Sequence, residues 1–319
     1  MVANDMMMAM RVHAFGPPDA IVQESIAIPA PEPDEVLVRV HAAGVGPWDG
    51  WIRSGKSVLP QPLPLTLGSD IAGVAERIGR DVTGVSPGDE VYGVTNARFT
   101  GGYAEYAACK AVMIARKPRN LSFVEAASAP VVAVTAWQML FDEAKLSAGQ
   151  TALIQGAAGS VGSYAVMLAL AAGVQVIASG REGQLEYLRG LGSHEVTLSS
   201  ELARYEGKAD AAIDLVGGPS RSQLLSCVKP GGSLVTAVPP PPTEAAKRRN
   251  VRASFLLVHV ETRYLDKLTT RFEAGQIQPY VGAVLPLAEA RSAHEMLDRI
   301  RPAKPGKIVL VPELPQANR

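Results

Sequence analysis

The apolar residues of the chain follow two different periods, and the change between them lies before its middle. From Met10 to about Lys117 the apolar segments are short, alternate with polar residues or carry β-branched side chains, and are separated by Pro and Gly. This pattern predicts β-strands at 11–15, 21–26, 35–43, 71–78, 90–93 and 103–110. A short helical turn is expected to begin at Pro47.

Helical spacing takes over at residues 122–144. Ser122 and Glu125 fit a capping box at the start of this segment, and Pro130 interrupts it. Strands and helices then alternate. Strands are predicted at 152–155, 174–178, 210–215, 233–238 and 253–260, and helices at 160–172, 182–191, 219–228 and 261–274. This alternation predicts a parallel sheet covered on both faces, which is an α/β fold. An amphipathic helix at 287–300 and a strand at 306–311 end the pattern.

Three evenly spaced glycines mark the joint between the first strand and helix of this sheet. The stretch reads Gly156-Ala157-Ala158-Gly159-Ser160-Val161-Gly162 and follows an apolar run. Glycines at such a joint allow positive φ and bring backbone N–H groups close to a ligand, and the helix N-terminus adds its partial positive charge. A strand, a glycine turn, a helix and a second strand predict a doubly wound Rossmann unit that binds the pyrophosphate of a dinucleotide. The cofactor-binding candidates here are Gly156, Ala157, Gly159, Ser160, Val161 and Gly162.

The tip of the second strand bears on the choice of cofactor. NAD-specific sites place an Asp or Glu there for the ribose hydroxyls, whereas this chain has Ser179-Gly180-Arg181. A guanidinium can hold a phosphate through two parallel bonds, and Ser179 can add a hydroxyl donor. The sequence therefore predicts NADPH, bound by Ser179 and Arg181. In the alternative, Arg181 is an exposed residue at a helix start and Glu182 binds the ribose.

Composition excludes several other classes of protein. The 319 residues carry 31 basic and 31 acidic side chains, so there is no electrostatic case for nucleic acid or an anionic membrane as partner. Two cysteines, Cys109 and Cys227, cannot form a disulfide framework or a four-ligand zinc site, and we expect both to be buried and reduced. The first ten residues lack the features of a signal peptide. We therefore expect a cytoplasmic protein.

Several stretches along almost the whole chain carry the motifs of one known family. They are Ala43-Gly44-Val45-Gly46-Pro47-Trp48-Asp49, Ile52-Arg53-Ser54-Gly55, Leu67-Gly68-Ser69-Asp70-Ile71-Ala72-Gly73-Val74, Pro87-Gly88-Asp89-Glu90-Val91-Tyr92-Gly93, Gly102-Tyr103-Ala104-Glu105-Tyr106, Val134-Thr135-Ala136-Trp137, the glycine turn, Leu215-Val216-Gly217-Gly218, Lys229-Pro230-Gly231-Gly232 and Gly306-Lys307-Ile308-Val309-Leu310. With these motifs the chain resembles the zinc-free branch of the medium-chain dehydrogenase/reductase superfamily, close to the NADPH:quinone oxidoreductases of the zeta-crystallin type. The resemblance implies a GroES-like β domain at 1–121 and 267–319, and a Rossmann NADP(H)-binding domain at 122–266.

The same resemblance implies further site residues. The nicotinamide end of the cofactor would be lined by Thr135, Val238, Phe255 and Leu257. Lys307 matches a family residue near the cofactor, although it could equally be a surface charge at a strand start. The acceptor pocket would lie near Trp48, Asp49 and Trp51. These three also have structural interpretations, since the tryptophans can be core residues at i and i+3, and Asp49 can cap the helical turn or pair with Arg53.

The chain lacks the zinc ligands of related alcohol dehydrogenases. Those enzymes place a cysteine where this chain has Gly46 and a histidine where it has Ser69. Neither residue can replace a thiolate or an imidazole, so we expect no metal. The zinc-free relatives have asparagine at the position of Gly46, which leaves a small open space here in which an acceptor could lie. At the aromatic position that follows in those relatives, this chain has Trp51.

These observations predict a metal-independent oxidoreductase that transfers hydride from NADPH to an electrophilic acceptor, either a quinone or an α,β-unsaturated ketone or aldehyde. No general acid is evident, and we expect the proton to come from solvent or a hydroxyl. One alternative is an enoyl reductase that acts on thioester-linked substrates. Another is a non-catalytic NADPH-binding protein, a role that lens zeta-crystallins show to be open to this fold.

The predicted strand at 252–260 also suggests a partner. It is long, apolar and late in the order of the Rossmann strands, so it is expected at the edge of the sheet. Exposed apolar edges pair readily with another strand. We therefore expect a homodimer in which this edge meets its two-fold mate.

Overall fold

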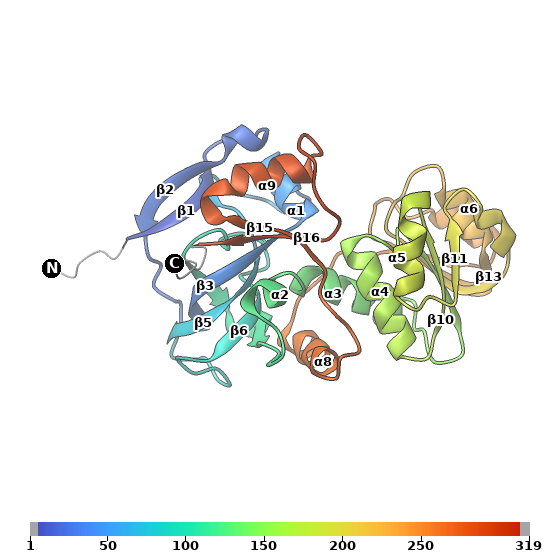
Figure 1. The fold of residues 1–319 in the computed structure, drawn as a ribbon, viewed down its shortest axis with the longest axis horizontal. Coiled ribbons are helices and arrows are strands. Elements are labelled where there is room, and N and C mark those ends of the chain that lie inside the picture. Colours follow the sequence, from blue (N-terminus) through green and yellow to red (C-terminus); the bar gives the residue numbers. More distant parts are fainter. Residues whose placement is uncertain (1–5, 313–319) are drawn as a thin grey trace. The chain divides into compact units, whose positions relative to one another are not determined.

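The computed structural model describes residues 6–312, which form two compact units (Figure 1). The first unit holds the described residues up to Val131, together with Val260–Glu273 and the described residues from Pro279 onward. The second holds Val132–His259 and Ala274–Gln278. The sequence placed the divisions at 121/122 and 266/267. The structure places the first division ten residues later, because α2 (Phe123–Ala127) packs on strands of the first unit. It places the second division seven residues earlier, because α8 (Thr262–Glu273) also packs on the first unit.

The first unit is a GroES-like β domain, as expected. Its larger sheet has the strand order β15-β16-β3-β5-β6-β8, with β7 also paired to β3, and its smaller sheet has the order β2-β1-β4. The strands are β1 (Met6–Val12), β2 (Val22–Ala27), β3 (Glu35–Val45), β4 (Leu65–Thr66), β5 (Asp70–Ile78), β6 (Glu90–Val94), β7 (Tyr106–Lys110), β8 (Ile114–Arg116), β15 (Val281–Pro286) and β16 (Lys307–Val311). Its other helices are α1 (Pro47–Arg53), α9 (Ala290–Leu297) and the 3₁₀ turns at Pro18–Ala20, Ala111–Met113 and Leu287–Glu289.

Segments from both ends of the chain complete this unit. Strand β16 pairs antiparallel with β3, with Ile308 opposite Val45, and α9 packs on β15 and β16. The first predicted strand, 11–15, is wrong, because β1 lies at Met6–Val12 and pairs with β2 from Met6 opposite Ala27. Its inward residues Met7 and Ala9 are buried against Ala104 and belong to the core, whereas Met6 is exposed.

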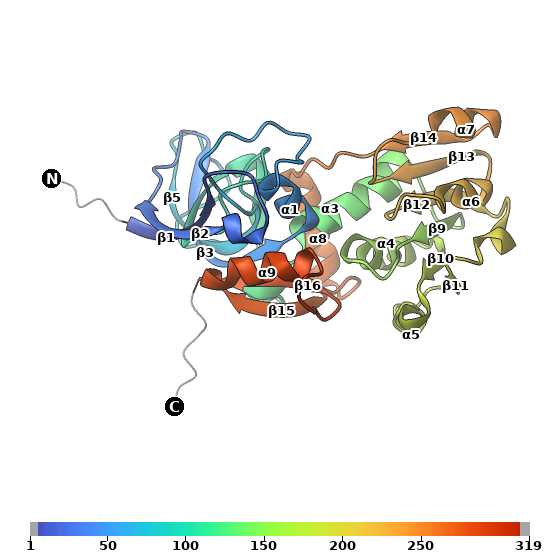
Figure 2. The same cartoon turned by 90° about the horizontal axis from the view of Figure 1, so that it is seen from above.

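The second unit is a Rossmann domain. Its parallel strands have the order β11-β10-β9-β12-β13-β14, which Figure 2 shows from above. The strands are β9 (Thr151–Gln155), β10 (Gln175–Gly180), β11 (Glu195–Leu198), β12 (Ala209–Asp214), β13 (Val228–Thr236) and β14 (Arg252–Phe255). Strand β11 has no counterpart among the predicted strands. The order reverses between β9 and β12, which is the topological switch point where such sheets bind ligands.

Helices cover both faces of this sheet, as expected (Figure 1). On one face lie α4 (Ser160–Ala171) and α5 (Leu185–Gly190), which connect β9, β10 and β11. On the other lies α6 (Arg221–Ser226), between β12 and β13, and α7 (Thr243–Arg248) precedes β14. The unit also contains most of α3 (Pro130–Trp137), a π-helical turn at Gln138–Glu143, and 3₁₀ turns at Glu182–Gln184 and Leu202–Tyr205. Pro130 begins α3, so the predicted interruption is confirmed, as is the Ser122 and Glu125 capping box.

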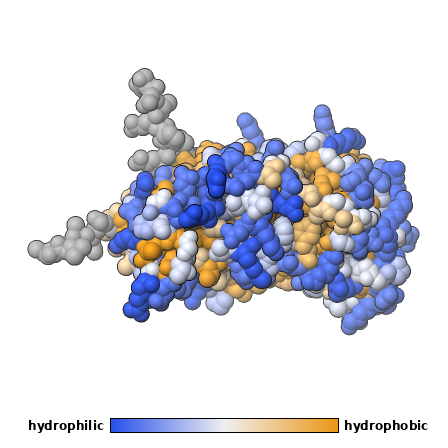
Figure 3. All heavy atoms as spheres, turned by 90° about the horizontal axis from the view of Figure 1, so that it is seen from below, coloured by the Kyte–Doolittle hydropathy of each residue, from blue (hydrophilic) through white to orange (hydrophobic). Residues whose placement is uncertain are grey.

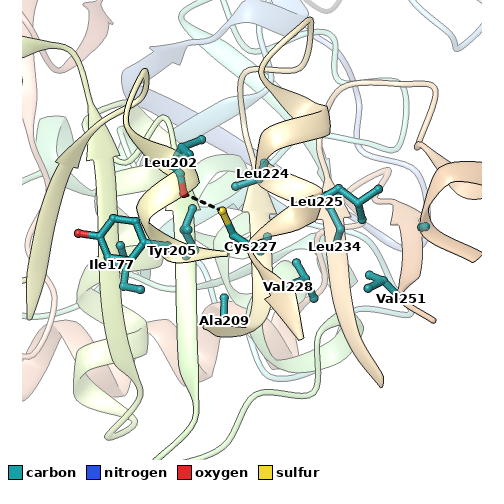
Figure 4. Packing of buried hydrophobic residues seen from close by; sticks show 13 residues of the cluster. Ile177, Leu202, Tyr205, Ala209, Leu224, Leu225, Cys227, Val228, Leu234 and Val251 are labelled. Atoms are coloured by element: carbon teal, nitrogen blue, oxygen red, sulfur yellow. Dashed lines mark hydrogen bonds between the residues drawn. The ribbon is translucent and has the colours of Figure 1, made fainter. Parts of the chain in front are cut away.

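Apolar side chains between the sheet and α6 form the core shown in Figure 4, which includes Leu224, Leu225, Val228 and Leu234. Cys227 lies within it, and its Sγ is 3.1 Å from the Leu202 carbonyl oxygen. Burial raises the pKa of the Cys227 thiol. Cys109 is buried in the first unit, and both cysteines are free. The expectation that they are small buried residues is therefore confirmed.

The predicted edge strand is much shorter than expected. Strand β14 ends at Phe255, so the prediction of a strand over 252–260 is wrong for its second half. Within the predicted second half, the His259 backbone is bound by the side chain of Gln138, whose Nε2 donates to the His259 carbonyl at 2.7 Å and whose Oε1 accepts from the His259 N–H at 3.3 Å. A glutamine thus satisfies backbone groups that a neighbouring strand would otherwise bind. Among the described strands, β14 pairs only with β13, so its edge position is confirmed.

None of the helices within residues 6–312 combines the length and the apolar character that crossing a membrane requires. Figure 3 shows one face of the molecule, on which hydrophilic side chains alternate with separate hydrophobic patches.

Candidate functional site

The carboxyl ends of five parallel strands of the second unit lie in register. Gln155 of β9 is opposite Ser179 of β10 and Asp214 of β12, Asp214 is opposite Thr236 of β13, and Thr236 is opposite Phe255 of β14. We call these five residues the strand-end row. The loops that follow them carry most of the predicted cofactor residues: the glycine turn, Arg181, Val238 and Leu257. The structure therefore gathers at one edge of the sheet residues that are a hundred positions apart in the chain.

The glycine turn has the backbone geometry that its sequence predicts. Gly156 has φ of +79°, which few other residues adopt. A Cβ on Gly162 would lie 2.6 Å from the Cα of Ala157, so only glycine lets α4 start this close to the turn. Ala157 is buried, and its N–H donates to the Ser179 carbonyl at 3.1 Å, which ties the turn to β10.

The N-terminus of α4 is open to a ligand. Gly159 is the N-cap residue and offers no side chain to the helix, while Gly159 and Ser160 are exposed and Val161 is half-buried. The first N–H groups of a helix have no partner within the helix, and together with the helix dipole they attract an anion. A cradle that a Cβ would fill, next to free N–H groups, fits the pyrophosphate of a dinucleotide.

Ser179 and Arg181 differ in their surroundings. Ser179 is completely buried at the end of β10, and its hydroxyl has no hydrogen-bond partner among the described atoms. Arg181 is exposed one residue beyond the strand, and its N–H donates to the Gln184 side chain at 3.0 Å. Arg181 is thus accessible to a ligand and Ser179 lies beneath the surface. Glu182, the alternative ribose ligand, is also exposed.

The residues predicted for the nicotinamide end lie in two places. Val238 and Phe255 are half-buried and follow or end neighbouring strands β13 and β14, and Leu257 is 50% exposed just beyond them. Thr135 is 7% exposed and lies on α3. The structure brings Val238, Phe255 and Leu257 to the same edge of the sheet as the glycine turn.

Sequence reasoning missed a buried ion pair at this edge, between Asp214 and Arg221. Asp214 is completely buried, and its Oδ2 accepts from the Arg221 Nε at 2.7 Å. Its Oδ1 accepts from the N–H groups of Val216 and Gly217 at 3.1 and 2.7 Å. An aspartate as the last residue of a buried strand, followed by two glycines, is a signal that could have indicated this pair.

The place of the missing zinc ligands in the first unit is filled by Trp48. A Cβ on Gly46 would overlap the Trp48 ring, so the expected open space at Gly46 is wrong. The Trp48 Nε1 donates to the Ser69 hydroxyl at 3.2 Å, and Ser69 is completely buried. Within residues 6–312, no three or more His, Cys, Asp or Glu side chains form a group that could hold a metal ion.

Lys307 lies on the face of the same indole. Its Nζ is 4.2 Å from the centroid of the Trp48 ring and 3.1 Å from the Oδ2 of Asp70. Lys307 is 4% exposed and Asp70 is completely buried, so Lys307 is a buried partner of Asp70. The alternative of a surface charge at a strand start is therefore wrong. Burial raises the pKa of Asp70, while Lys307 acts in the opposite direction. The Asp70 Oδ1 also accepts from the Val131 N–H at 3.1 Å.

Asp49 is a buried carboxyl group with only one of its oxygens bonded. Its Oδ2 accepts from the Gly46 N–H at 2.8 Å and from the Tyr103 hydroxyl at 3.0 Å, whereas its Oδ1 is buried without a partner among the described atoms. Burial raises the pKa of Asp49 to about 7, against the effect of these hydrogen bonds and of Lys307. The capping interpretation of Asp49 is confirmed. Its pairing with Arg53 is wrong, since the Arg53 Nη2 bonds Asp298 at 2.5 Å.

Two other residues near Asp49 differ in exposure. Trp51 is 53% exposed, so the interpretation of both tryptophans as core is wrong for Trp51. His294 of α9 is completely buried, neither ring nitrogen has a partner among the described atoms, and its ring lies edge-on to Tyr103. Burial lowers the pKa of His294 to about 3, so it is neutral at physiological pH. The first unit therefore brings Trp48, Asp49 and Lys307 together and leaves Trp51 at its surface.

Two segments of the chain match known domain families. Residues 32–119 match the alcohol dehydrogenase GroES-like domain, and residues 191–310 match the zinc-binding dehydrogenase family. Among whole proteins, the chain is 32% identical over 310 residues to the quinone oxidoreductase of Homo sapiens, covering 91% of this chain and 93% of that one. It is 34% identical over 283 residues to 2-methylene-furan-3-one reductase of Solanum lycopersicum, covering 84% of this chain and 69% of that protein.

Solved structures give the same result. The quinone oxidoreductase of Coxiella burnetii matches with a TM-score of 0.88 at 31% identity and covers 97% of this chain and 100% of that one. The mycobacterial protein Rv1454c, solved in complex with NADPH, matches with a TM-score of 0.83 at 27% identity, covering 96% of this chain and 100% of that one.

Proposed function

Because the chain belongs to the quinone oxidoreductase family of the medium-chain dehydrogenase/reductase superfamily and is therefore an oxidoreductase with a nicotinamide cofactor, we propose that it transfers hydride from NADPH to a conjugated carbonyl acceptor. The acceptor is a quinone or an α,β-unsaturated ketone or aldehyde. The observation that carries the proposal is the strand-end row. The loops that follow it bring the glycine turn, Arg181 and Val238 to one edge of the sheet, around its switch point. Two relatives support the acceptor class by name, as a quinone oxidoreductase and an enone reductase.

The residues present fit a dinucleotide cofactor. The N–H groups of Ser160 and Val161 would hold the pyrophosphate, since the glycine turn allows close approach there. Val238 and Leu257 would lie toward the nicotinamide. When bound, the dihydronicotinamide supplies the hydride. The protein's part is to bind and orient it.

Preference for NADPH over NADH rests on Arg181. Its exposed guanidinium follows the second strand of the sheet, where an acidic side chain would serve NADH. Arginine binds phosphate through two parallel charge-assisted hydrogen bonds. The Ser179 hydroxyl is buried and has no partner among the described atoms, so it keeps a donor for a bound phosphate.

The residues of the first unit support an acceptor that is already electrophilic. Gly46 offers no ligand atom, and the hydroxyl of Ser69 is engaged by the Trp48 indole, so no side chain here is placed to hold a metal that would polarise a simple ketone. Conjugation spreads the arriving negative charge onto oxygen, which lowers the need for such help. Metal independence is part of this proposal.

A panel of acceptors at fixed NADPH, with a chelator present, tests the proposal. It comprises 1,4-benzoquinone, 9,10-phenanthrenequinone, an alkenone, an alkenal, an enoyl thioester, and a secondary alcohol with NADP. We expect turnover with the quinones or with the alkenone and alkenal. Turnover with the thioester alone would favour an enoyl-thioester reductase instead. Chelator-sensitive oxidation of the alcohol, without activity on conjugated acceptors, would refute the proposal.

We also propose a homodimer through the edge of the Rossmann sheet. Strand β14 has a ladder partner on one side only among the described strands, and Leu257 beyond it is half exposed. Pairing of β14 with its two-fold mate would cover that edge. Light scattering at micromolar concentration should give twice the monomer mass of 33.6 kDa. A monomer would refute it. A cytoplasmic location stays a prediction from the two free, buried cysteines.

A further inference from the structure

The loop after β13 has an unusual hydrogen-bonding capacity. It contains Pro239-Pro240-Pro241-Pro242, four residues without a backbone N–H. Such a loop cannot donate hydrogen bonds through these residues, but each of them keeps a carbonyl oxygen that can accept one. A group that fixes the loop in place must therefore be rich in donors and poor in acceptors.

Arg221, the first residue of α6, meets this requirement. A guanidinium has five N–H donors in a planar fork and no acceptor. Its Nη1 donates to the Pro240 carbonyl at 2.6 Å, and its Nη2 donates to the Val238 carbonyl at 2.7 Å. Nη2 also lies 3.3 Å from the Thr236 hydroxyl. The side chain of Arg221 is 13% exposed, and its bond to Val238 is partly buried, whereas its bond to Pro240 lies at the surface.

Asp214 holds the guanidinium in this orientation. The Arg221 Nε donates to its Oδ2, and the Thr236 hydroxyl lies 3.0 Å from the same oxygen. Since its other oxygen accepts from the N–H groups of Val216 and Gly217, one carboxylate connects the loop after β12 with the loop after β13. The two loops also touch. A Cβ on Gly217 would lie 2.8 Å from the Cγ1 of Val238.

These two loops lie on one side of the topological switch point. Strand β9 and the glycine turn lie between β12 and β10, the strand that Arg181 follows. A dinucleotide that places its pyrophosphate on α4 spans the switch point, with one nucleotide half over each half of the sheet. With the 2′-phosphate at Arg181, the nicotinamide half must lie over the ends of β12 and β13.

We infer that Arg221 is the positioning residue for the nicotinamide end of the cofactor. It touches no cofactor atom itself. It fixes the carbonyl groups of Val238 and Pro240, and with them the backbone against which the nicotinamide ring is oriented. This inference rests on the proposed function, because it assumes that a nicotinamide dinucleotide binds across the strand-end row.

The test compares wild type with Arg221→Gln and Arg221→Lys in the full chain. Calorimetry measures the affinity for NADPH and for ADP-ribose 2′-phosphate, which lacks only the nicotinamide ring. Both variants should bind NADPH at least about tenfold more weakly, because each loses charge-assisted bonds to the loop. Affinity for ADP-ribose 2′-phosphate should change less than about twofold, because the glycine turn and Arg181 are untouched.

The control is Arg204→Gln, since Arg204 is an exposed arginine of the same unit that pairs with Glu201 at 3.1 Å. It should change neither affinity. A second measurement is amide hydrogen exchange at Ala237 and Val238, which should accelerate in both Arg221 variants because the loop is released. If Arg221→Gln does not fold, Arg221→Lys, which keeps a positive charge beside Asp214, decides by the same two measurements.

Equal losses for NADPH and ADP-ribose 2′-phosphate would overturn the inference, since Arg221 would then act through the whole domain. An unchanged NADPH affinity would overturn it as well. If wild type binds NADH but not NADPH, the two ligands to compare are NADH and ADP-ribose, and the same outcomes apply. Wild type that binds neither dinucleotide would instead refute the proposed function, and this inference with it.

Discussion

Each unit of the molecule buries an aspartate beside its candidate residues, and the two are bonded in opposite ways. In the Rossmann unit, both oxygens of Asp214 accept hydrogen bonds, and one faces the Arg221 guanidinium. In the GroES-like unit, only the Oδ2 of Asp49 accepts hydrogen bonds, both from uncharged groups. Both side chains are completely buried.

The difference separates an aspartate in an ion pair, Asp214, from an aspartate with a raised pKa, Asp49. A buried carboxylate with a cation and several donors is stabilised as an anion and holds its surroundings in one arrangement. A buried carboxyl group with a free oxygen favours its protonated form, and its pKa rises. The Rossmann unit thus uses its aspartate to hold loops, whereas the GroES-like unit keeps a group that titrates near neutral pH.

The largest expected effect comes from breaking the fixed pair. Asp214→Asn removes the negative charge and leaves the Arg221 guanidinium buried without a counterion, which should lower the free energy of unfolding by about 3–5 kcal/mol. Urea denaturation measures it. The matched control is Asp34→Asn, since Asp34 forms an exposed pair with Lys110 at 2.9 Å, and the expected loss there is much smaller because water screens the pair. Similar losses for both variants would contradict the account.

A pH series tests the proton of Asp49. Its pKa is about 7 in the folded protein against 3.8 for the ordinary group, so between these values the folded state binds more protons than the unfolded state. The free energy of unfolding must therefore fall as pH rises from about 4 to about 7, by at most about 4 kcal/mol at about 1.4 kcal/mol per pKa unit. The difference between wild type and Asp49→Asn isolates this effect, because the amide does not titrate. Parallel stability curves for the two proteins would be the wrong result.

Removal of Arg181 should affect ligand binding and leave the fold intact, because the side chain is exposed. Arg181→Ala should weaken NADPH binding by about 1.5–3 kcal/mol, since a charge-assisted phosphate contact is lost, and should leave NADH binding nearly unchanged. The measurement is the affinity of both cofactors by calorimetry. Arg189→Ala, an exposed arginine at the far end of α5, serves as control. Equal losses with both cofactors would show that Arg181 does not contact the 2′-phosphate.

A smaller effect tests the packing of the GroES-like unit. Gly46→Ala forces a Cβ into the Trp48 ring, which should cost about 1–3 kcal/mol of unfolding free energy. In a Trp48→Ala background the same substitution meets open space and should cost less than about 1 kcal/mol. Gly46→Ala, measured by urea denaturation in both backgrounds, completes a double-mutant cycle with Trp48→Ala. A cost independent of Trp48 would show that the indole does not fill the space at Gly46.

The sequence predicted the parts of the fold that depend on local pattern. The glycine turn, the capping box at Ser122 and the helix break at Pro130 each have a local physical cause, and all three are confirmed. The family motifs identified both domains. The second half of the predicted strand 252–260 could not be judged in this way, because the His259 backbone is bound by Gln138, more than a hundred residues earlier.

The candidate sites show the same limit. Capping the helical turn was one of the alternatives for Asp49, but its bond to Tyr103 joins residues 54 positions apart. The sequence predicted an open space at Gly46 because glycine has no side chain. It could not show that the neighbouring Trp48 ring fills this space. Arg221 carried no motif, and its bonds to Asp214, Val238 and Pro240 are seen only in the folded loop.

Deuterium transfer tests the central claim most directly. NADPH labelled with deuterium at C4 of the nicotinamide, in its 4R and 4S forms, is incubated with the protein and an alkenone, and the product is examined by NMR. Our account predicts a saturated ketone that carries one deuterium on the carbon β to the carbonyl, from only one of the two forms, while the α carbon takes a proton from solvent. An unlabelled product, or an allylic alcohol with deuterium on the former carbonyl carbon, would contradict it.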